Sequence, residues 1–267
     1  MDERIEHFYD EFSETFLRDY VRGNRRNERQ HRFFEEAIPP DTTRALVIGC
    51  GSGEGARFIA TRVARQASIV AVDISAQNLR LAEKLFNHPR IEYRKLNVVT
   101  DPLAGEWELV VLPDVYEHIP RDLRSTLHAR LDRLLSPTGR ILVSVPTPAA
   151  QAQVLSSGGD LQIVDEPVTL DDLVRMARDV RATVTYFAMV SIWRTDDYIY
   201  AVLERGGGQC RPLDRADKLP VKGHPRQNRV VRGWRSTARF LGFHRLLRWR
   251  RQRRIRAFVR NDGKKIG

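Results

Sequence analysis

Residues 44–55 read Arg-Ala-Leu-Val-Ile-Gly-Cys-Gly-Ser-Gly-Glu-Gly. A short apolar run, Ala45 to Ile48, leads into alternating glycines, and apolar residues at helical spacing follow from Ala56. This order predicts a buried parallel strand, a tight turn and a helix. Because the glycines have no side chains, a ligand can approach the backbone at the turn, where the helix begins with free N–H groups.

The spacing of the glycines restricts the kind of ligand. Gly49, Gly51, Gly53 and Gly55 alternate, and no Lys-Ser/Thr pair follows them, which excludes a phosphate-binding P-loop. The acidic residue Glu54 would repel a pyrophosphate, so a ligand with an amino-acid cation fits better. A tight turn that binds no ligand is the alternative.

The segment from Val47 to Gly53 resembles the first motif of class I S-adenosylmethionine-dependent methyltransferases, written D/E-x-G-x-G-x-G. The chain departs from this motif at its first position, where Val47 replaces the usual acid. In the family this acid helps to fix the loop and the methionine end of the cofactor. The resemblance implies S-adenosyl-L-methionine as the cofactor and a methyltransferase as the enzyme.

The composition divides the chain into two parts of opposite charge. Residues 205–267 hold 20 Lys/Arg and three Asp/Glu, although the whole chain has a net charge of only +11. The body before them is mildly acidic, so polyanion binding should belong to the tail. Two cysteines, an acidic start and no apolar run of membrane-spanning length predict a cytoplasmic protein, with the inner face of the membrane as a peripheral location.

Alternating strand and helix patterns predict an α/β fold. We expect a doubly wound, mostly parallel, seven-stranded sheet with a terminal antiparallel hairpin, which is a Rossmann-like methyltransferase fold. The predicted domains are a helical lid at 1–39, the methyltransferase domain at 40–205, and a linker with a basic amphipathic tail at 206–267. A single helix over 3–38, a turn at 136–139 and a long loop at 146–168 complete this prediction. The predicted strands cover 45–48, 69–72, 91–96, 108–112, 140–145, 184–190 and 198–203.

Cofactor-binding residues are expected where the parallel strands end, because ligands of such sheets bind at the carboxyl ends of strands. Asp73 can accept hydrogen bonds from both ribose hydroxyls, or it can serve as a helix cap. By resemblance to the family, Asn97 accepts from the adenine amino group, although a plain turn Asn is the alternative. The full set of predicted cofactor contacts is Gly49, Gly51, Gly53, Asp73, Ile74, Asn97, Val98 and Pro113.

The segment 112–120 resembles the family's V-L-E-H-I segment, which lies beside the transferred methyl group. His118 is the predicted general base, with Glu117 beside it, because a hydroxyl acceptor benefits from deprotonation. The alternative is that both residues cap the next helix and orient the loop. Asp165 and Glu166 are candidate contacts to the substrate or a metal, but no residue spacing indicates a metal site.

Motifs that the chain lacks restrict the acceptor. It has neither the Asn/Asp-Pro-Pro-Tyr/Phe motif that methylates base amines nor a Pro-Cys nucleophile for cytosine. We expect O-methylation of a glycan or small-molecule hydroxyl. The segment 190–198 is similar to methyltransferases of glycan and cell-envelope biosynthesis, which agrees with that expectation.

The tail from 229 to 260 interleaves arginine with Trp, Phe and Leu. This pattern is typical of a helix on an anionic membrane surface. It also fits an RNA-binding arm, which we consider less favoured, or a solvated tail. The rival functions are therefore an RNA methyltransferase and a non-catalytic binding protein with a degenerate cofactor site.

Overall fold

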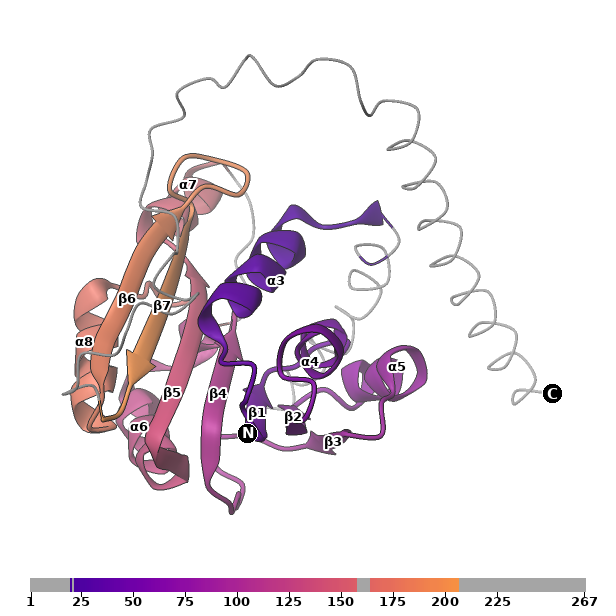
Figure 1. The fold of residues 1–267 in the computed structure, drawn as a ribbon. Coiled ribbons are helices and arrows are strands. Elements are labelled where there is room, and N and C mark those ends of the chain that lie inside the picture. Colours follow the sequence, from indigo (N-terminus) through magenta and orange to yellow (C-terminus); the bar gives the residue numbers. More distant parts are fainter. Residues whose placement is uncertain (1–19, 21, 158–163, 207–267) are drawn as a thin grey trace, which may run out of the picture.

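The computed structural model describes residues 20, 22–157 and 164–206, which form a seven-stranded sheet covered by helices (Figure 1). The strand order is β3-β2-β1-β4-β5-β7-β6. Strands β1 to β5 run parallel, and β7 lies antiparallel between β5 and β6. The predicted doubly wound sheet with its terminal hairpin is confirmed. The strands are β1 (Arg44–Ile48), β2 (Ser68–Asp73), β3 (Ile91–Lys95), β4 (Trp107–Pro113), β5 (Leu135–Pro146), β6 (Thr183–Val190) and β7 (Tyr198–Glu204).

Helices cover both faces of the sheet, and the strands present alternate side chains to each. In β1, Ala45 and Val47 join an apolar cluster with α3 and α4, whereas Leu46 and Ile48 join a second cluster with α6 and α8. The site lies where these buried strands end. The helices are α3 (Arg25–Ala37), α4 (Glu54–Phe58), the π-helical η1 (Ile59–Val63), α5 (Ala76–Phe86), the 3-10 turn η2 (Tyr116–His118), α6 (Arg121–Leu134), α7 (Pro148–Ser156) and α8 (Leu170–Asp179).

The N-terminal helix is interrupted, and the prediction of one helix over 3–38 was wrong at this point. Gly23 has a φ of +84°, and the side chain of Asn24 accepts a hydrogen bond from the Arg26 N–H at 2.8 Å. Asn24 is therefore an N-cap, and α3 begins at Arg25. Residues 3–19 of the predicted helix and the tail from 207 onward lie outside the described residues.

Strand β5 begins earlier than predicted, because residues 136–139 continue as strand instead of forming a turn. Leu135 pairs with Trp107, and the ladder between β4 and β5 shifts register between Trp107 and Leu109. A Cβ at Gly139 would lie 2.9 Å from the backbone oxygen of Trp107, so glycine allows the close approach. A second difference is α7, which occupies part of the predicted loop 146–168 and is capped by Thr147.

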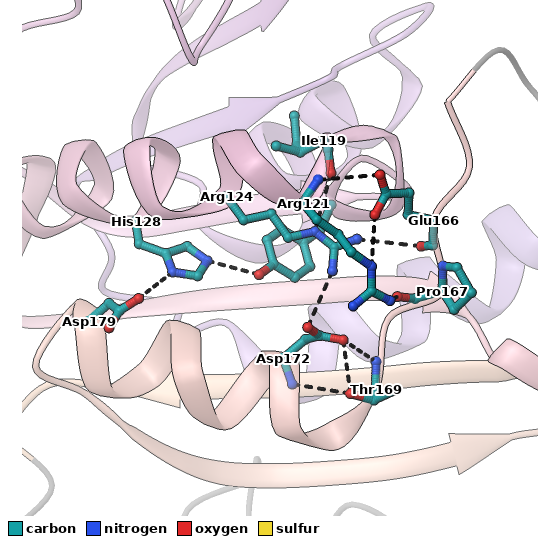
Figure 2. A network of polar contacts seen from close by, with 10 residues as sticks. Ile119, Arg121, Arg124, His128, Glu166, Pro167, Thr169, Asp172 and Asp179 are labelled. Carbon is teal, nitrogen blue, oxygen red and sulfur yellow. Dashed lines mark hydrogen bonds and ion pairs between the residues drawn. The ribbon is translucent and has the colours of Figure 1, made fainter.

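A polar network fixes η2, the turn after β4, against α6 and α8 (Figure 2). The Tyr116 hydroxyl lies 2.8 Å from Nε2 of His128, whose Nδ1 lies 2.7 Å from an Asp179 carboxylate oxygen. Because the carboxylate can only accept, Nδ1 carries the hydrogen and Nε2 accepts from Tyr116. Tyr116 and His128 are each 1% exposed, and burial lowers the pKa of His128 and raises that of Tyr116 to about 12.

Two arginines of α6 extend this network to the segment before α8. The Arg124 guanidinium lies over the Tyr116 ring at 4.6 Å, donates to the Ile119 carbonyl at 3.2 Å and pairs with Asp172 at 3.4 Å. Arg121 pairs with Glu166 at 2.9 Å. The backbone from 116 to 119 is thereby held to two helices. Among the residues that the structure describes, no helix has both the length and the apolar character needed to cross a bilayer.

We expect His128→Ala to lower the free energy of unfolding by about 2–4 kcal/mol, because it opens a cavity and leaves a buried hydroxyl unpaired. The pKa of His128 is lower in the folded chain, so below about pH 6.5 the unfolded chain binds a proton that the folded chain does not. Wild-type stability should therefore fall from pH 7 to pH 5, and the variant should lose less of its stability. Urea unfolding at several pH values measures both effects.

A double-mutant cycle with Tyr116→Phe is the control for this prediction. The hydrogen bond between the two side chains should give a coupling energy of about 1 kcal/mol or more. A coupling near zero would show that the pair adds nothing beyond its packing.

Candidate functional site

The glycine loop after β1 is pinned to both neighbouring strands. The N–H groups of Gly49 and Cys50 both donate to the Val72 carbonyl, at 2.8 and 3.0 Å. Gly49 has a φ of +67°, and a Cβ there would lie 2.2 Å from Cγ2 of Val115. Only glycine allows this conformation together with this contact. The loop therefore touches the segment that follows β4 directly.

Asp73, at the end of β2, braces the same loop. One carboxylate oxygen accepts from the Gly51 N–H at 2.8 Å, and the other accepts from the Ser75 N–H at 2.9 Å. Asp73 is 7% exposed. Burial raises its pKa, although the hydrogen bonds from the backbone act in the opposite direction. The oxygen that accepts from Ser75 also accepts from the Asn78 side-chain amide at 3.5 Å, so the oxygen that accepts from Gly51 has more capacity left for a ligand hydroxyl. From the sequence we predicted that Asp73 binds a ligand, but not that it accepts a hydrogen bond from the glycine loop.

Asn97 lies two residues beyond β3, which ends at Lys95. Its side-chain oxygen accepts from the Val99 N–H at 2.9 Å, and its own N–H donates to Asp101 at 2.9 Å. Asn97 thus builds a turn, and its predicted contact with adenine stays a prediction. Val98 is 5% exposed within the core.

The strand registers bring the predicted cofactor contacts to one edge of the sheet. Ile48 pairs with Val72, and Asp73 pairs with Lys95, so the glycine loop, Asp73, Ile74 and Asn97 follow neighbouring strand ends. Pro113 ends β4 on the other side of β1. Val47, at the position of the family's acid, is 2% exposed within the apolar cluster that α3 and α4 cover.

His118 has a defined tautomer. Its Nδ1 lies 2.7 Å from the Val164 carbonyl oxygen, which can only accept, so Nδ1 carries the hydrogen. Nε2 is then the basic nitrogen of the neutral ring, and it lies 3.8 Å from Oε1 of Glu117. Burial lowers the pKa of His118, so the ring is neutral near pH 7.

Glu117 is 1% exposed and is placed among other charged groups. Burial raises its pKa well above the usual range, and the charges of Asp114 and Asp165 add to that effect. Arg26 of α3 pairs with Asp114 at 3.4 Å. Burial opposes the charge of Arg26, yet Asp114, Tyr198 and Glu117 together raise its pKa. We call this group the polar cluster; its members are Arg26, Asp114, Glu117, His118, Asp165 and Tyr198.

Sequence reasoning missed part of the polar cluster and gave the neighbours Asp165 and Glu166 the same role. It placed Arg26 within the predicted N-terminal helix, and Tyr198 in a predicted strand and in the segment 190–198, without giving either a role in the site. Asp165 accepts from Gln151 beside the cluster, whereas Glu166 pairs with Arg121 in the network of α6 and α8. Only tertiary contacts distinguish these residues. In the described part of the chain, no group of three or more His, Cys, Asp and Glu is placed to hold a metal ion.

Known proteins share this site's framework. Residues 45–139 match a methyltransferase domain family. A 2-phytyl-1,4-naphtoquinone methyltransferase of Thermosynechococcus vestitus is 32% identical over 110 residues, which are 39% of this chain and 46% of that protein. An uncharacterized protein of Rickettsia prowazekii is 25% identical over 41% of this chain and 45% of its own length. The chain thus spans less than half the length of these curated relatives.

Solved structures show the same fold at low identity. The structure of a DhpI–SAH complex matches with a TM-score of 0.59 and 15% identity, over 77% of this chain and 97% of that one. A putative methyltransferase of Haloferax volcanii, solved with the Trm112 activator, matches with a TM-score of 0.62 and 11% identity, over 78% and 100% of the two chains. The chain therefore has the fold of S-adenosylmethionine-dependent methyltransferases, and its residues 45–139 are similar to a methyltransferase domain.

Proposed function

We propose that this chain transfers a methyl group from S-adenosylmethionine to a hydroxyl oxygen of a glycan or a small molecule. The observation that carries the proposal is the buried, tautomerically fixed His118 in the polar cluster after β4. A hydroxyl is a poor nucleophile, so a base that takes up its proton helps the reaction. The absence from the sequence of the base-amine and cytosine motifs agrees with this choice.

The cofactor fits the donors and acceptors at the strand ends. The Asp73 oxygen that accepts from Gly51 can also accept from a ribose hydroxyl, and the glycine loop presents backbone without side chains. Asn97 and Val98 would face the adenine, with Ile74 as an apolar wall and Pro113 toward the acceptor. The bound cofactor supplies an activated methyl group on a sulfonium, so the protein must supply alignment and proton removal.

The protein's part in the reaction is then to hold and move one proton. The bound cofactor would supply the methyl group, and Nε2 of His118 would take up the proton that the acceptor hydroxyl loses. The Val164 carbonyl keeps the hydrogen on Nδ1 and so keeps Nε2 basic. Burial raises the pKa of Glu117, which favours the neutral form of this neighbour beside the imidazole.

Cofactor binding is tested with S-adenosylhomocysteine and calorimetry. Asp73→Ala should weaken binding about 10- to 100-fold, because a hydrogen bond to a charged group contributes about 1.5–3 kcal/mol. NAD should not compete. Asp41→Ala, which removes an exposed carboxylate at the turn before β1, is the matched control and should bind as wild type does. Wild-type protein that does not bind at millimolar ligand would contradict the enzyme proposal.

The role of His118 is tested by His118→Gln, which should lower kcat by about 10²- to 10⁴-fold without weakening S-adenosylhomocysteine binding. Because the pKa of His118 is lowered, the wild-type rate should stay high as pH falls to 6.5 and decline below it. His88→Gln, at a partly exposed histidine, is the control. An unchanged rate in His118→Gln would assign His118 to holding the loop only.

We also propose that the tail from 229 to 260 binds anionic membranes, because its arginines alternate with Trp, Phe and Leu. The full-length protein should sediment with vesicles of phosphatidylcholine and phosphatidylglycerol, but not with pure phosphatidylcholine. Replacing Arg248, Arg250, Arg251, Arg253 and Arg254 with Gln should weaken sedimentation by at least tenfold, at about 1 kcal/mol per basic residue. Strong, salt-sensitive tRNA binding with no vesicle binding would favour the RNA methyltransferase instead.

A further inference from the structure

Trp193 is an exposed aromatic residue on a braced turn. The Asp197 carboxylate accepts from the N–H groups of Ile192, Trp193 and Arg194 at 2.7, 2.9 and 3.0 Å. Asp197 is 6% exposed, and its carbonyl accepts from the Thr147 N–H, which ties the turn to the start of α7. The Trp193 side chain is nevertheless 53% exposed. Single exposed apolar residues are common, but here three hydrogen bonds fix the backbone that presents one.

The indole of Trp193 lies next to the polar cluster. Its ring meets the Tyr198 ring edge-on, with 6.0 Å between centroids. Tyr198 lies against Arg26, and Tyr200 follows on the same face of β7, 6.5 Å from Tyr198. Tyr200 stacks in turn on Phe33 of α3 at 4.7 Å. An aromatic wall therefore runs from the exposed turn into the buried cluster.

Along this wall and in the polar cluster, four polar atoms are buried without a hydrogen-bond partner in the described part of the chain. They are the Tyr200 hydroxyl, Oδ1 of Asp114, Oε2 of Glu117 and the donor Nε of Arg26. Tyr200 is 2% exposed and Glu117 is 1% exposed. Arg26 pairs with Asp114 at 3.4 Å, and burial and then the charge of Asp114 raise the pKa of Tyr200. Buried polar atoms are normally paired, so the unpaired atoms of this region are candidates for hydrogen bonds with a ligand.

The unpaired atoms define the chemistry of that ligand. Two of them are carboxyl oxygens, which accept hydrogen bonds from hydroxyl groups. Asp114 pairs with Arg26 at 3.4 Å, and Asp165 also belongs to the cluster, so an anionic ligand would meet two carboxylates and one guanidinium. Arg26 already supplies the cation of the cluster. An aromatic face next to hydrogen-bond acceptors suits a ring with an apolar face and hydroxyl groups around it.

We propose that Trp193, Tyr198 and Tyr200, with Asp114 and Glu117, form an acceptor subsite for a neutral saccharide ring. The ring stacks on Trp193, and its hydroxyls pair with the buried oxygens. This inference rests on the proposed methyltransferase function and names the substrate class of that site. A flat aromatic acceptor would leave the carboxyl oxygens and the Tyr200 hydroxyl unpaired, and a site with unpaired buried groups discriminates strongly against such a ligand.

The test titrates full-length protein, loaded with S-adenosylhomocysteine, with a panel of neutral mono- and disaccharides and their uronic acid counterparts. Saturation-transfer NMR detects weak binding. We expect neutral members to bind, uronic acids to bind at least tenfold more weakly, and Trp193→Ala to weaken binding about tenfold. Val174→Ala, at an exposed residue of α8, is the matched control and should bind as wild type does.

Tyr200→Phe separates a ligand role from a structural one. Removing an unpaired buried hydroxyl should leave the melting temperature unchanged or raise it, because no hydrogen bond is lost. The same change should weaken saccharide binding about fivefold, because one hydrogen bond to the ligand is lost. A lower melting temperature with unchanged saccharide binding would assign the hydroxyl to the fold and overturn its place in the subsite.

The outcomes distinguish this proposal from the methyltransferase proposal. No binding by any neutral saccharide, binding that is equal in Trp193→Ala, or a preference for uronic acids or planar quinols would overturn the saccharide subsite. None of these results changes the calorimetry with S-adenosylhomocysteine. If the protein bound saccharides but not S-adenosylhomocysteine, the methyl-transfer proposal would be wrong. The saccharide titration would still test the subsite.

Discussion

The site depends on one buried carboxylate. Asp73 joins the end of β2, the glycine loop and the start of α5 by accepting from Gly51 and Ser75. Burial disfavours its charge, and the backbone N–H groups offset that cost. The loop held in this way then packs Gly49 against Val115, so the position of the β4 segment follows from the position of the loop. The same contacts therefore fix both the predicted cofactor-binding loop and the segment after β4 that we predict to lie beside the acceptor.

Much of the fold could be predicted from the sequence because its signals are local. Apolar runs, glycine spacing and helix caps lie within a few residues of the elements they define, and they predicted the seven strands and Asp73. Arg26 and Tyr200 carry no such signal, since their role arises from contacts across the sheet. The early start of β5 was missed for the same reason: pairing with Trp107 overrides the turn preference of Pro137 and Gly139.

Adjacent residues acquire opposite roles once the chain is folded. Asp165 lies beside the polar cluster, while Glu166 pairs with Arg121 on the outer side. The Asp179–His128–Tyr116 series has the geometry of a catalytic relay, but Tyr116 and His128 are 1% exposed and pack under α6 and α8. The two histidines differ in exposure, because His128 is 1% exposed whereas the His118 side chain is 13% exposed. His128 therefore supports the fold, and His118 is the histidine that we propose for the chemistry.

The segment after β4 has paired, stabilising residues on one side and the proposed functional residues on the other. On the side of α6 and α8, Tyr116 and His128 pair with each other, so burying them costs little. On the other side, the Tyr200 hydroxyl, Asp114 and Glu117 keep unpaired oxygens, each with a cost of about 1–3 kcal/mol. A fold can keep such atoms if the neighbouring network holds the segment in place without them. The network in Figure 2 thus holds the β4 segment on the side where its polar groups are paired, and we propose that a ligand supplies the hydrogen bonds on the other side.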